Sequence, residues 1–318
     1  MTEMKNQFLE DVKKGFESTP KFLSSKYFYD EVGDNLFVEI MNMPEYYLFN
    51  AEHEIFKLQS KALIEGFNLD KETYFELIEF GAGDGTKTKE LLKELDAQDY
   101  QFDYLPIDIS QHALNNLGNS LQQELPNVSV KPKQGEYFEV LEALKNSNHP
   151  KVILFLGSNI GNLNDDEAHN FLYRLGSNIK SDDKLLLGVD LIKPVEIVLP
   201  AYNDKTQITA KFNLNLLTRI NRELGAEFIL EQFQHKPEYT EEEGIAKSFL
   251  VSKKDQNVFI KSLNKTVSFQ EGEKIHTEIS RKYNSDIINS ILNKTDFEVK
   301  QKYIDSNNQF ADFILNKQ

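Results

Sequence analysis

The stretch Tyr74-Phe-Glu-Leu-Ile-Glu-Phe-Gly-Ala-Gly-Asp-Gly-Thr-Lys-Thr88 decides the fold. Its apolar first half predicts a buried β-strand. The glycines that follow let the backbone turn sharply and approach a ligand closely. We expect a helix over 88–95 with Thr86 as its cap. A strand, a glycine turn and a helix N-terminus together favour a nucleotide-like ligand, although a plain tight turn has the same pattern.

A second strand is predicted over Gln101–Asp108, and it ends in a carboxylate. In doubly wound folds this position binds the hydroxyl groups of a ribose. Glu79 and Asp84 make the glycine loop acidic, which disfavours a pyrophosphate and favours a ligand with positive charge. The loop also lacks the glycine spacing of a phosphate-binding loop. S-adenosylmethionine, with its sulfonium, amino acid tail and ribose, fits these features better than NAD and is the predicted cofactor.

Strand and helix signals continue to alternate along the chain. Apolar runs at 151–156 and 181–190 predict strands that are covered on both faces, with a helix over 165–179 between them. Ser110 can cap a helix that ends near Leu121. The segments 297–304 and 309–315 flank a turn and predict a terminal hairpin. The expected fold is therefore α/β, a Rossmann-like parallel sheet closed by an antiparallel hairpin, as in class I methyltransferases.

Two regions do not fit this sheet. Residues 1–55 have helical patterns. Residues 193–283 contain a helix near 209–224 and then short strand patterns at 228–233, 246–252, 258–263, 267–269 and 274–283. We therefore expect a methyl-donor-binding core from 56–192 and 284–318. A smaller α+β substrate-binding domain, built from 1–55 and 193–283, is expected to close over the mouth of the sheet.

Composition narrows the classes of function. The chain has 318 residues, 40% of them hydrophobic, and lacks cysteine, so a disulfide framework or a thiolate nucleophile is excluded. A net charge of −15 disfavours nucleic acid, and the six histidines lack metal-binding spacing. No signal peptide or membrane-spanning segment is apparent. We expect a cytoplasmic protein, a monomer, that acts on a small molecule without a metal, a membrane or a nucleic acid.

A specific resemblance extends from about Lys21 to Leu315. The chain is similar to the L-histidine Nα-methyltransferase family in six motifs that occur in the same order: Phe28-Tyr-Asp-Glu-Val-Gly-Asp-Asn-Leu-Phe37, Pro44-Glu-Tyr-Tyr47, Leu156-Gly-Ser-Asn-Ile-Gly-Asn-Leu163, Phe212-Asn213, Asn221-Arg-Glu-Leu224 and Thr277-Glu-Ile-Ser280. The resemblance implies a seven-stranded sheet and trimethylation of the α-amine of histidine to hercynine, the first step of ergothioneine biosynthesis.

The resemblance also implies the site residues. On the substrate side, tyrosines line the pocket, an asparagine and a further tyrosine hold the amino acid end, and a Glu–Ser pair recognises the imidazole. These residues are, in that order, Tyr29 and Tyr46, Asn162 and Tyr202, and Glu278 and Ser280. On the donor side, Gly81 and Lys87 belong to the glycine loop, Asp108 binds the ribose, and Glu136 and Tyr137 replace the usual Asp-Phe beside the adenine. No catalytic base is assigned, because positioning supplies most of the catalysis in such a displacement.

One departure from the family concerns the side-chain pocket. The family commonly has a methionine beside the imidazole, where this chain has Ser248 or, one register away, Lys247. Either residue makes the pocket more polar, so another amino acid or an imidazole compound is an alternative substrate. A non-catalytic S-adenosylmethionine-binding module and an NAD-dependent dehydrogenase are the alternatives from other classes. Taken alone, Tyr29 and Tyr46 are also compatible with core packing, and Glu278 with a solvated face.

Overall fold

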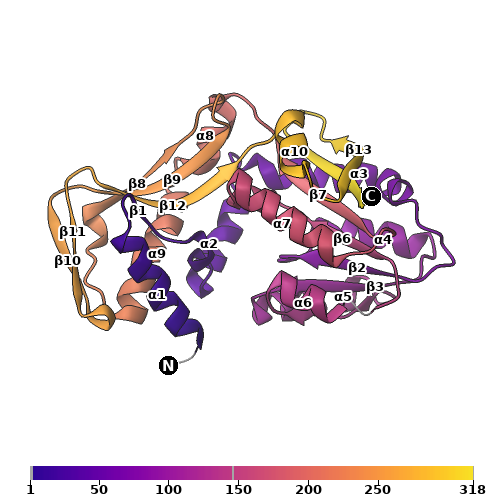
Figure 1. Ribbon diagram of the computed structural model, residues 1–318, viewed down its shortest axis with the longest axis horizontal. Coiled ribbons are helices and arrows are strands. Elements are labelled where there is room, and N and C mark those ends of the chain that lie inside the picture. The colour runs from indigo at the N-terminus through magenta and orange to yellow at the C-terminus, as the bar shows by residue number, and fades with distance from the viewer. Residues whose placement is uncertain (1–2, 145–146, 318) are drawn as a thin grey trace. The chain divides into compact units, whose positions relative to one another are not determined.

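The computed structural model describes residues 3–144 and 147–317, and these form two compact units (Figure 1). The core unit comprises Leu48–Ile192 and the chain from Lys282 onward. The insert unit comprises the chain up to Tyr47 and Lys193–Arg281. Each unit therefore joins two segments that are far apart in the sequence.

The core unit is built on a mixed sheet with the strand order β13-β14-β7-β6-β2-β3-β4. Strands β2 to β7 are parallel, and β14 pairs antiparallel with β7 and with β13. The strands are β2 (Phe75–Phe80), β3 (Phe102–Asp108), β4 (Ser129–Val130), β5 (Lys133–Gln134), β6 (Lys151–Phe155), β7 (Lys184–Asp190), β13 (Phe297–Ile304) and β14 (Phe310–Lys317). The predicted class I methyltransferase fold is confirmed. Its edge differs in one detail, because β4 and β5 both pair with β3.

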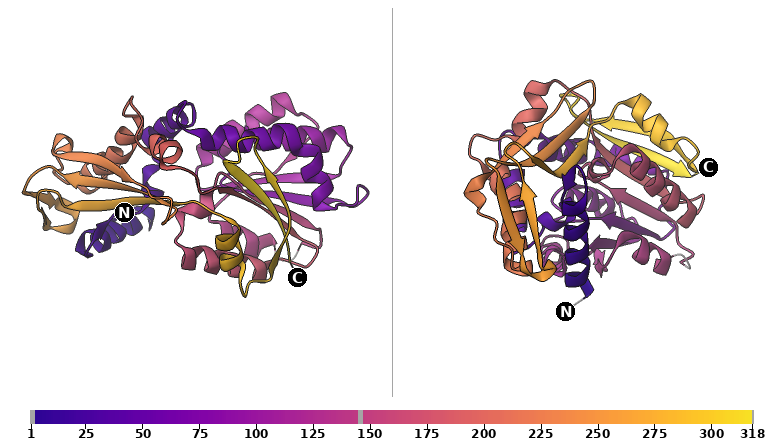
Figure 2. Two further views of the ribbon diagram at one scale, coloured as in Figure 1. Left: turned by 90° about the horizontal axis from the view of Figure 1, so that it is seen from above. Right: turned by 60° about the vertical axis from the view of Figure 1, so that its left-hand side comes forward.

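Helices cover both faces of this sheet, as the two views of Figure 2 show. One hydrophobic cluster joins the sheet to α3 (Tyr47–Phe67), α4 (Thr88–Ala97) and α5 (Gln111–Glu124). The other joins it to α6 (Tyr137–Leu144), α7 (Asp165–Asn178) and α10 (Ser285–Leu292). Every residue of β6 is buried, which explains the continuous apolar run of that strand.

The capping predictions have different outcomes. Ser110 caps α5, since its hydroxyl oxygen accepts a hydrogen bond from the Ala113 N–H at 3.2 Å. The prediction that Thr86 caps α4 is wrong. The cap position is occupied by Lys87, and the Thr86 hydroxyl donates to Asp84 at 2.7 Å instead. A carboxylate two residues away competes for this hydroxyl before the helix begins.

The insert unit packs helices against a four-stranded sheet with the order β1-β12-β9-β8, and a separate hairpin, β10–β11, joins the same hydrophobic cluster. Its elements are α1 (Glu3–Glu17), β1 (Lys21–Phe22), η1 (Ser25–Phe28), α2 (Glu31–Met41), α8 (Val195–Tyr202), α9 (Ile208–Leu224), η3 (Leu230–Gln232), β8 (Phe233–Glu238), β9 (Ile245–Ser252), β10 (Gln256–Ile260), η4 (Lys261–Leu263), β11 (Lys265–Phe269) and β12 (Lys274–Arg281). Helix α9 contributes most of its buried side chains to this cluster.

One local prediction in the insert unit is wrong, and two elements are not predicted. The predicted strand at 228–233 ends where β8 begins, and part of it is the short helix η3. Strand β8 escaped detection because it is polar and contains Pro237, which an edge strand tolerates. Helix α8 was also missed, and it contains Pro200.

The first boundary between the units differs from the expected position after residue 55. Helix α3 begins at Tyr47, and Ala51 and Ile55 are buried in the hydrophobic cluster of the core unit. Residues 48–55 are therefore part of the core unit. This places Glu52 of α3, which is fully buried, in the core unit.

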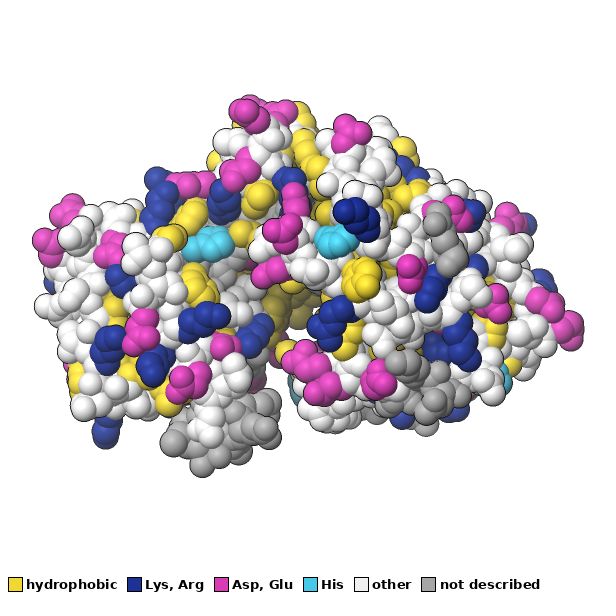
Figure 3. Space-filling view, viewed as in Figure 1, with side chains coloured by type: hydrophobic (Ala, Val, Ile, Leu, Met, Phe, Trp, Pro, Cys, Tyr) yellow, Lys and Arg dark blue, Asp and Glu magenta, His cyan; other side chains and the backbone are white. Residues whose placement is uncertain are grey.

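Charge is distributed evenly on the face seen in Figure 3, where Lys and Arg side chains alternate with Asp and Glu. Within residues 3–144 and 147–317, no helix has the length and apolar character needed to cross a membrane. The same residues contain no cluster of His, Cys, Asp and Glu side chains that could hold a metal ion.

Candidate functional site

The glycine loop follows β2 and packs closely on its neighbours. Gly81, Gly83 and Gly85 have φ values of +68°, +55° and +65°, which residues other than glycine rarely adopt. A Cβ on Gly81 would lie 2.9 Å from the Tyr137 hydroxyl oxygen, and one on Gly85 would lie 2.5 Å from Leu117 Cδ1. The loop therefore requires glycine both for its backbone conformation and for its close approach to α5 and α6.

Asp108 is the last residue of β3 and joins three loops. Its carboxylate accepts hydrogen bonds from the Gly83 N–H at 3.3 Å and the Ser110 N–H at 2.9 Å. Its backbone carbonyl accepts from the Gly135 N–H at 3.2 Å. The loops after β2, β3 and β5 thus meet at Asp108, at the carboxyl edge of the parallel strands, where ligands of doubly wound sheets bind.

Glu136 and Tyr137 lie beside the same edge at the start of α6. The Tyr137 ring stacks on Phe80, with centroids 4.8 Å apart and planes inclined by 10°. Burial, together with the charges of Asp108 and Glu136, raises the pKa of the Tyr137 hydroxyl, which therefore stays protonated. A carboxylate, an aromatic ring and a glycine loop in one place fit the ribose and base of a nucleoside.

Lys87 follows the glycine loop and is mostly buried, with 17% of its side chain exposed. Its ammonium forms an ion pair with Glu52 of α3 and lies 6.0 Å from the centre of the Phe49 ring. Burial alone would lower the pKa of Lys87, but the attraction of Glu52 outweighs it and raises that pKa. Lys87 is therefore a buried charged group beside the glycine loop and not a solvated surface lysine.

Glu79 does not contribute to an acidic loop surface, and this part of the sequence interpretation is wrong. Its side chain is buried and accepts hydrogen bonds from the Thr88 hydroxyl at 2.8 Å and from the Tyr104 hydroxyl. Burial raises the pKa of Glu79 to about 7, so this carboxyl holds a proton over much of the acidic range. Asp84 and Glu136 are exposed, and Asp108 is partly buried.

Asn162 ends the short helix η2 (Asn159–Asn162), which follows β6. The turn before it contains Ser158 at φ +56°, whose hydroxyl oxygen accepts from the Asp190 N–H at 3.0 Å. The Tyr283 hydroxyl donates to the Ile160 carbonyl at 3.2 Å. Two neighbouring segments thus hold the turn, and Asn162 itself is exposed.

The aromatic motifs of the insert unit contact one another. Tyr29 is 40% exposed, and its ring lies 5.6 Å from Phe37 and 5.8 Å from Phe212. Tyr46 packs against the same Phe37, with centroids 6.3 Å apart. Tyr29 and Tyr46 therefore share a neighbour, and Tyr29 presents part of its ring to solvent. Tyr202, at the end of α8, is mostly buried.

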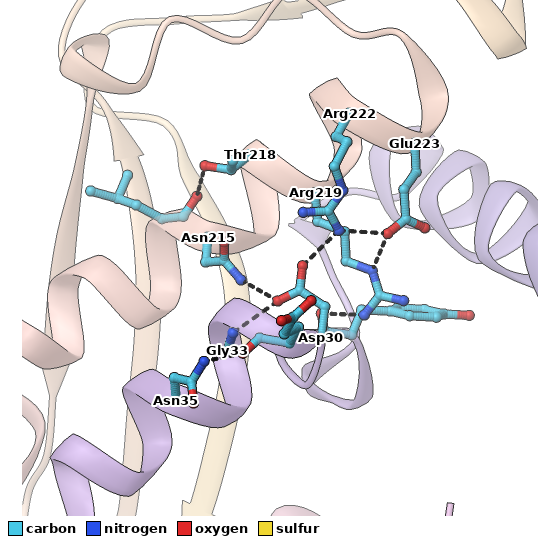
Figure 4. A network of polar contacts seen from close by, with 11 residues as sticks. Asp30, Gly33, Asn35, Asn215, Thr218, Arg219, Arg222 and Glu223 are labelled. Carbon is cyan, nitrogen blue, oxygen red and sulfur yellow. Dashed lines mark hydrogen bonds and ion pairs between the residues drawn. The ribbon is translucent and has the colours of Figure 1, made fainter. Parts of the chain in front are cut away.

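Asp30, next to Tyr29, is the centre of a polar network that joins α2 to α9 (Figure 4). Its carboxylate caps α2 through the Gly33 N–H at 2.8 Å and accepts from Asn215 at 2.8 Å and Arg222 at 2.7 Å. Burial would raise the pKa of Asp30, but the hydrogen bond from Arg222 and the others outweigh it and lower that pKa. The motifs around Asp30 and Arg222, 192 residues apart, are thus one structural feature.

Replacing Asp30 by alanine should lower the free energy of unfolding by about 2–3 kcal/mol, since a helix cap and a charged hydrogen bond are lost together. Urea unfolding of the purified variant measures this. Asn35→Ala is the matched control, because Asn35 is exposed and donates to the Glu31 carbonyl of its own helix. An Asp30→Ala loss no larger than that of Asn35→Ala contradicts the role of the network.

Glu278 lies on β12 opposite Ser248 of β9. The Ser248 hydroxyl donates to the Glu278 carboxylate at 3.2 Å. Lys247 is opposite Ile279, and its ammonium contacts Glu243. Ser248, and not Lys247, is therefore the neighbour of Glu278.

The Thr277–Ser280 motif also contacts α9. The Thr277 hydroxyl donates to the Asn213 side-chain carbonyl at 2.7 Å, and the Asn213 amide donates to the Thr209 carbonyl at 3.1 Å. Asn213 is fully buried, and Ser280 is nearly so. These contacts explain why the Phe212-Asn213 and Thr277–Ser280 motifs occur together, which the sequence alone does not show.

The predicted residues divide between the two units. The core unit contains Gly81, Lys87, Asp108, Glu136, Tyr137 and Asn162, and the insert unit contains Tyr29, Tyr46, Tyr202, Glu278 and Ser280. Sequence reasoning missed Glu52, the partner of Lys87, and the Asp30–Arg222 contact. Glu52 carries no local signal, because it is one of several charged residues on a helix whose pairing depends on the tertiary fold.

Comparisons with known proteins identify the family of the chain. The family model of histidine-specific, SAM-dependent methyltransferases matches residues 8–317. The histidine N-alpha-methyltransferase of Mycolicibacterium smegmatis is 33% identical over 86% of this chain and 83% of its own length, and that of Mycobacterium tuberculosis is 34% identical over 89% and 86%. The N-methyltransferase imqF of Aspergillus flavus is 26% identical over 95% and 82%. The chain belongs to the family of histidine-specific, S-adenosylmethionine-dependent methyltransferases.

Proposed function

We propose that this protein methylates the α-amine of L-histidine with S-adenosylmethionine as donor, and that it continues to the trimethylated product hercynine. The observation that carries the proposal is Glu278 beside Ser248 in a chain whose family match extends over residues 8–317. Two relatives of similar length carry the name histidine N-alpha-methyltransferase. Family membership removes the dehydrogenase alternative.

In this proposal the core unit binds the donor. Asp108 accepts hydrogen bonds from the ribose hydroxyls, the Tyr137 ring packs beside the adenine, and Lys87 binds the donor carboxylate. The glycine loop permits close approach, since a Cβ on Gly81 would already crowd the Tyr137 hydroxyl. When bound, S-adenosylmethionine supplies an electrophilic methyl group on a sulfonium.

Polar side chains of the protein bind both ends of the amino acid substrate. Asn162 can donate and accept, so it can hold the α-amine and the carboxylate, and Tyr202 adds a donor for the carboxylate. Glu278 accepts an imidazole N–H, while Ser280 serves the other ring nitrogen or supports the glutamate. Tyr29 and Tyr46 line the pocket. Because the amine attacks as a neutral group, these residues act by orienting it, and no dedicated base is assigned.

The polar residue Ser248 favours histidine and does not exclude it. Its hydroxyl donates to Glu278, so the serine is used to orient the carboxylate. A carboxylate held in this way keeps a lone pair for an N–H donor of the substrate. Another amino acid with a side-chain N–H is the second candidate, because the family resemblance also extends to an N-methyltransferase of different name at 26% identity.

Product analysis tests the proposal directly. The purified protein is incubated with S-adenosylmethionine and, separately, histidine, tryptophan, phenylalanine, glutamine or arginine, and the products are identified by mass spectrometry. We expect histidine to react fastest and to accumulate with three added methyl groups. Preference for another amino acid contradicts the substrate assignment. Absence of any product despite tight binding of S-adenosylhomocysteine contradicts the catalytic role.

A further inference from the structure

We propose that Glu52 is a positioning residue that holds the glycine loop after β2 next to the turn that carries Asn162. Donor binding and amino acid binding then both depend on one buried carboxylate. The inference rests on the proposed function. It adds a residue that lies outside the six family motifs and outside the glycine loop. All of the contacts that support it lie within the core unit.

Glu52 is completely buried, and its carboxylate has specific partners. The ammonium of Lys87 forms an ion pair with it. The Gly157 N–H donates to its two oxygens, at 2.8 and 3.0 Å. An unpaired buried carboxylate would be strongly destabilising, so these bonds define where both partners can lie. Because Glu52 has no exposed surface, it acts through them and not by touching substrate.

The two partners belong to two different loops of the site. Lys87 ends the glycine loop that follows β2 and stands at the start of α4. Gly157 follows β6 at φ +70° and directly precedes Ser158 and the η2 helix that ends at Asn162. Strands β2 and β6 are neighbours, with Phe80 opposite Phe155. One carboxylate therefore bridges the loops at the ends of adjacent parallel strands.

The sheet leaves space for this carboxylate at Gly188 of β7. A Cβ at that position would lie 2.2 Å from one Glu52 carboxylate oxygen and 2.9 Å from an Asp312 oxygen. Gly188 is therefore a second, independent position from which the bridge can be disturbed. Substituting alanine there would push the Glu52 carboxylate away from its partners.

Other carboxyl groups near Lys87 do not replace Glu52. Asp312 is fully buried, and neither of its oxygens has a hydrogen-bond partner in the described part of the chain. Burial raises the pKa of Asp312 well above its usual range, so this carboxyl favours the neutral form. The Glu79 carboxyl is engaged elsewhere, by the hydroxyls of Thr88 and Tyr104. Glu52 is the carboxylate that directly contacts the Lys87 ammonium.

Loss of the Glu52 carboxylate should affect both of its partners, Lys87 and Gly157. An ammonium has three N–H donors, so Lys87 can bond to Glu52 and still donate to the carboxylate of the methyl donor. Without Glu52 the lysine side chain regains rotamer freedom, and the Gly157 N–H loses its acceptor. Donor affinity and the orientation of Asn162 should then weaken together.

The test compares Glu52→Gln and Gly188→Ala with Glu54→Gln. Glu54 lies on the same helix but is only partly buried, and it accepts from the Ser306 N–H at 2.8 Å. Calorimetry with S-adenosylhomocysteine should show affinity about tenfold weaker for Glu52→Gln, the effect of losing a charged hydrogen bond, and unchanged affinity for Glu54→Gln. The KM for histidine should also rise in Glu52→Gln. Unchanged donor affinity in a folded Glu52→Gln variant overturns the proposal, and Gly188→Ala gives the same test if Glu52→Gln does not fold.

A double-mutant cycle with Lys87→Met separates positioning from a general structural role. If Glu52 acts through Lys87, the losses of donor affinity in the two single variants do not multiply in the double variant. Losses that multiply overturn the proposal. A wild-type protein that binds S-adenosylhomocysteine but leaves histidine unmethylated would contradict the proposed function alone, since the calorimetric cycle needs no turnover. Normal methylation with an insensitive Glu52→Gln variant would contradict this inference alone.

Discussion

An Asp108→Ala variant is expected to bind S-adenosylhomocysteine more weakly than the wild type by roughly 1.5–3 kcal/mol, the range for a lost hydrogen bond to a charged group. Asp108 ends β3 at the edge where loops from three strands meet, and its carboxylate is fixed by the Gly83 and Ser110 N–H groups. Fixed in this way, it needs little reorganisation to accept the ribose hydroxyls. Calorimetry measures the loss, and unchanged affinity contradicts the ribose assignment.

A neighbouring acid provides the control for charge alone. Asp84 lies in the same loop and is exposed, but its carboxylate is occupied by the Thr86 N–H at 3.0 Å and the Thr86 hydroxyl at 2.7 Å. If general attraction to the sulfonium determined affinity, Asp84→Ala would weaken S-adenosylmethionine binding as much as Asp108→Ala. We expect a smaller effect, because Asp84 interacts with the donor only through partly screened charge.

A donor analogue shows whether Asp108→Ala loses affinity because the ribose contact is missing or because the loop is less ordered. S-adenosylhomocysteine without ribose hydroxyls should bind the wild type more weakly, while Asp108→Ala should barely distinguish it from the complete ligand. If Asp108 served only to order the loop, the variant would discriminate between the two ligands as well as the wild type does. The cycle thus assigns the lost energy to one contact.

The fold could be predicted from the sequence because its signals are local. The apolar run at 151–156 matches β6, which is buried along its whole length, and the glycines after β2 all adopt positive φ. Strand β8 could not be predicted, because an edge strand with one polar face needs no apolar run and tolerates Pro237. Its identity as a strand comes from pairing with β9, which is a tertiary contact.

The site was predictable only in part, for a related reason. Asp108 is marked by its place at the end of a strand. In contrast, the direction of the Glu79 side chain, toward Thr88 and Tyr104, does not follow from its position before the glycines. Glu52 contacts a residue 35 positions away and another 105 away. Such pairs are set by how α3 packs on the sheet, and helical periodicity carries no information about them.

The largest expected effect concerns substrate choice through Glu278. Glu278→Ala should lower kcat/KM for histidine by a factor that corresponds to on the order of 2–4 kcal/mol of transition-state stabilisation. The kcat/KM for tryptophan or phenylalanine should change much less. A partly buried carboxylate that accepts an imidazole N–H penalises substrates without that donor, because they leave a desolvated charge unpaired. The ratio of kcat/KM values for histidine and tryptophan should therefore fall together with the rate.

Ser248 tests whether the carboxylate must also be oriented. Its hydroxyl donates to Glu278 at 3.2 Å, so Ser248→Ala should cost histidine turnover about 1 kcal/mol, the usual net value of such a bond. In the Glu278→Ala background the same serine substitution should have little further effect, because its partner is gone. Lys247→Ala is the matched control, since that side chain contacts Glu243.

If Glu278→Ala slows the turnover of all amino acids equally, the glutamate supports the β12–β9 pair and does not select the substrate. Histidine recognition would then have to come from the aromatic residues Tyr29 and Tyr46, whose packing cannot distinguish an imidazole from another flat ring by hydrogen bonding.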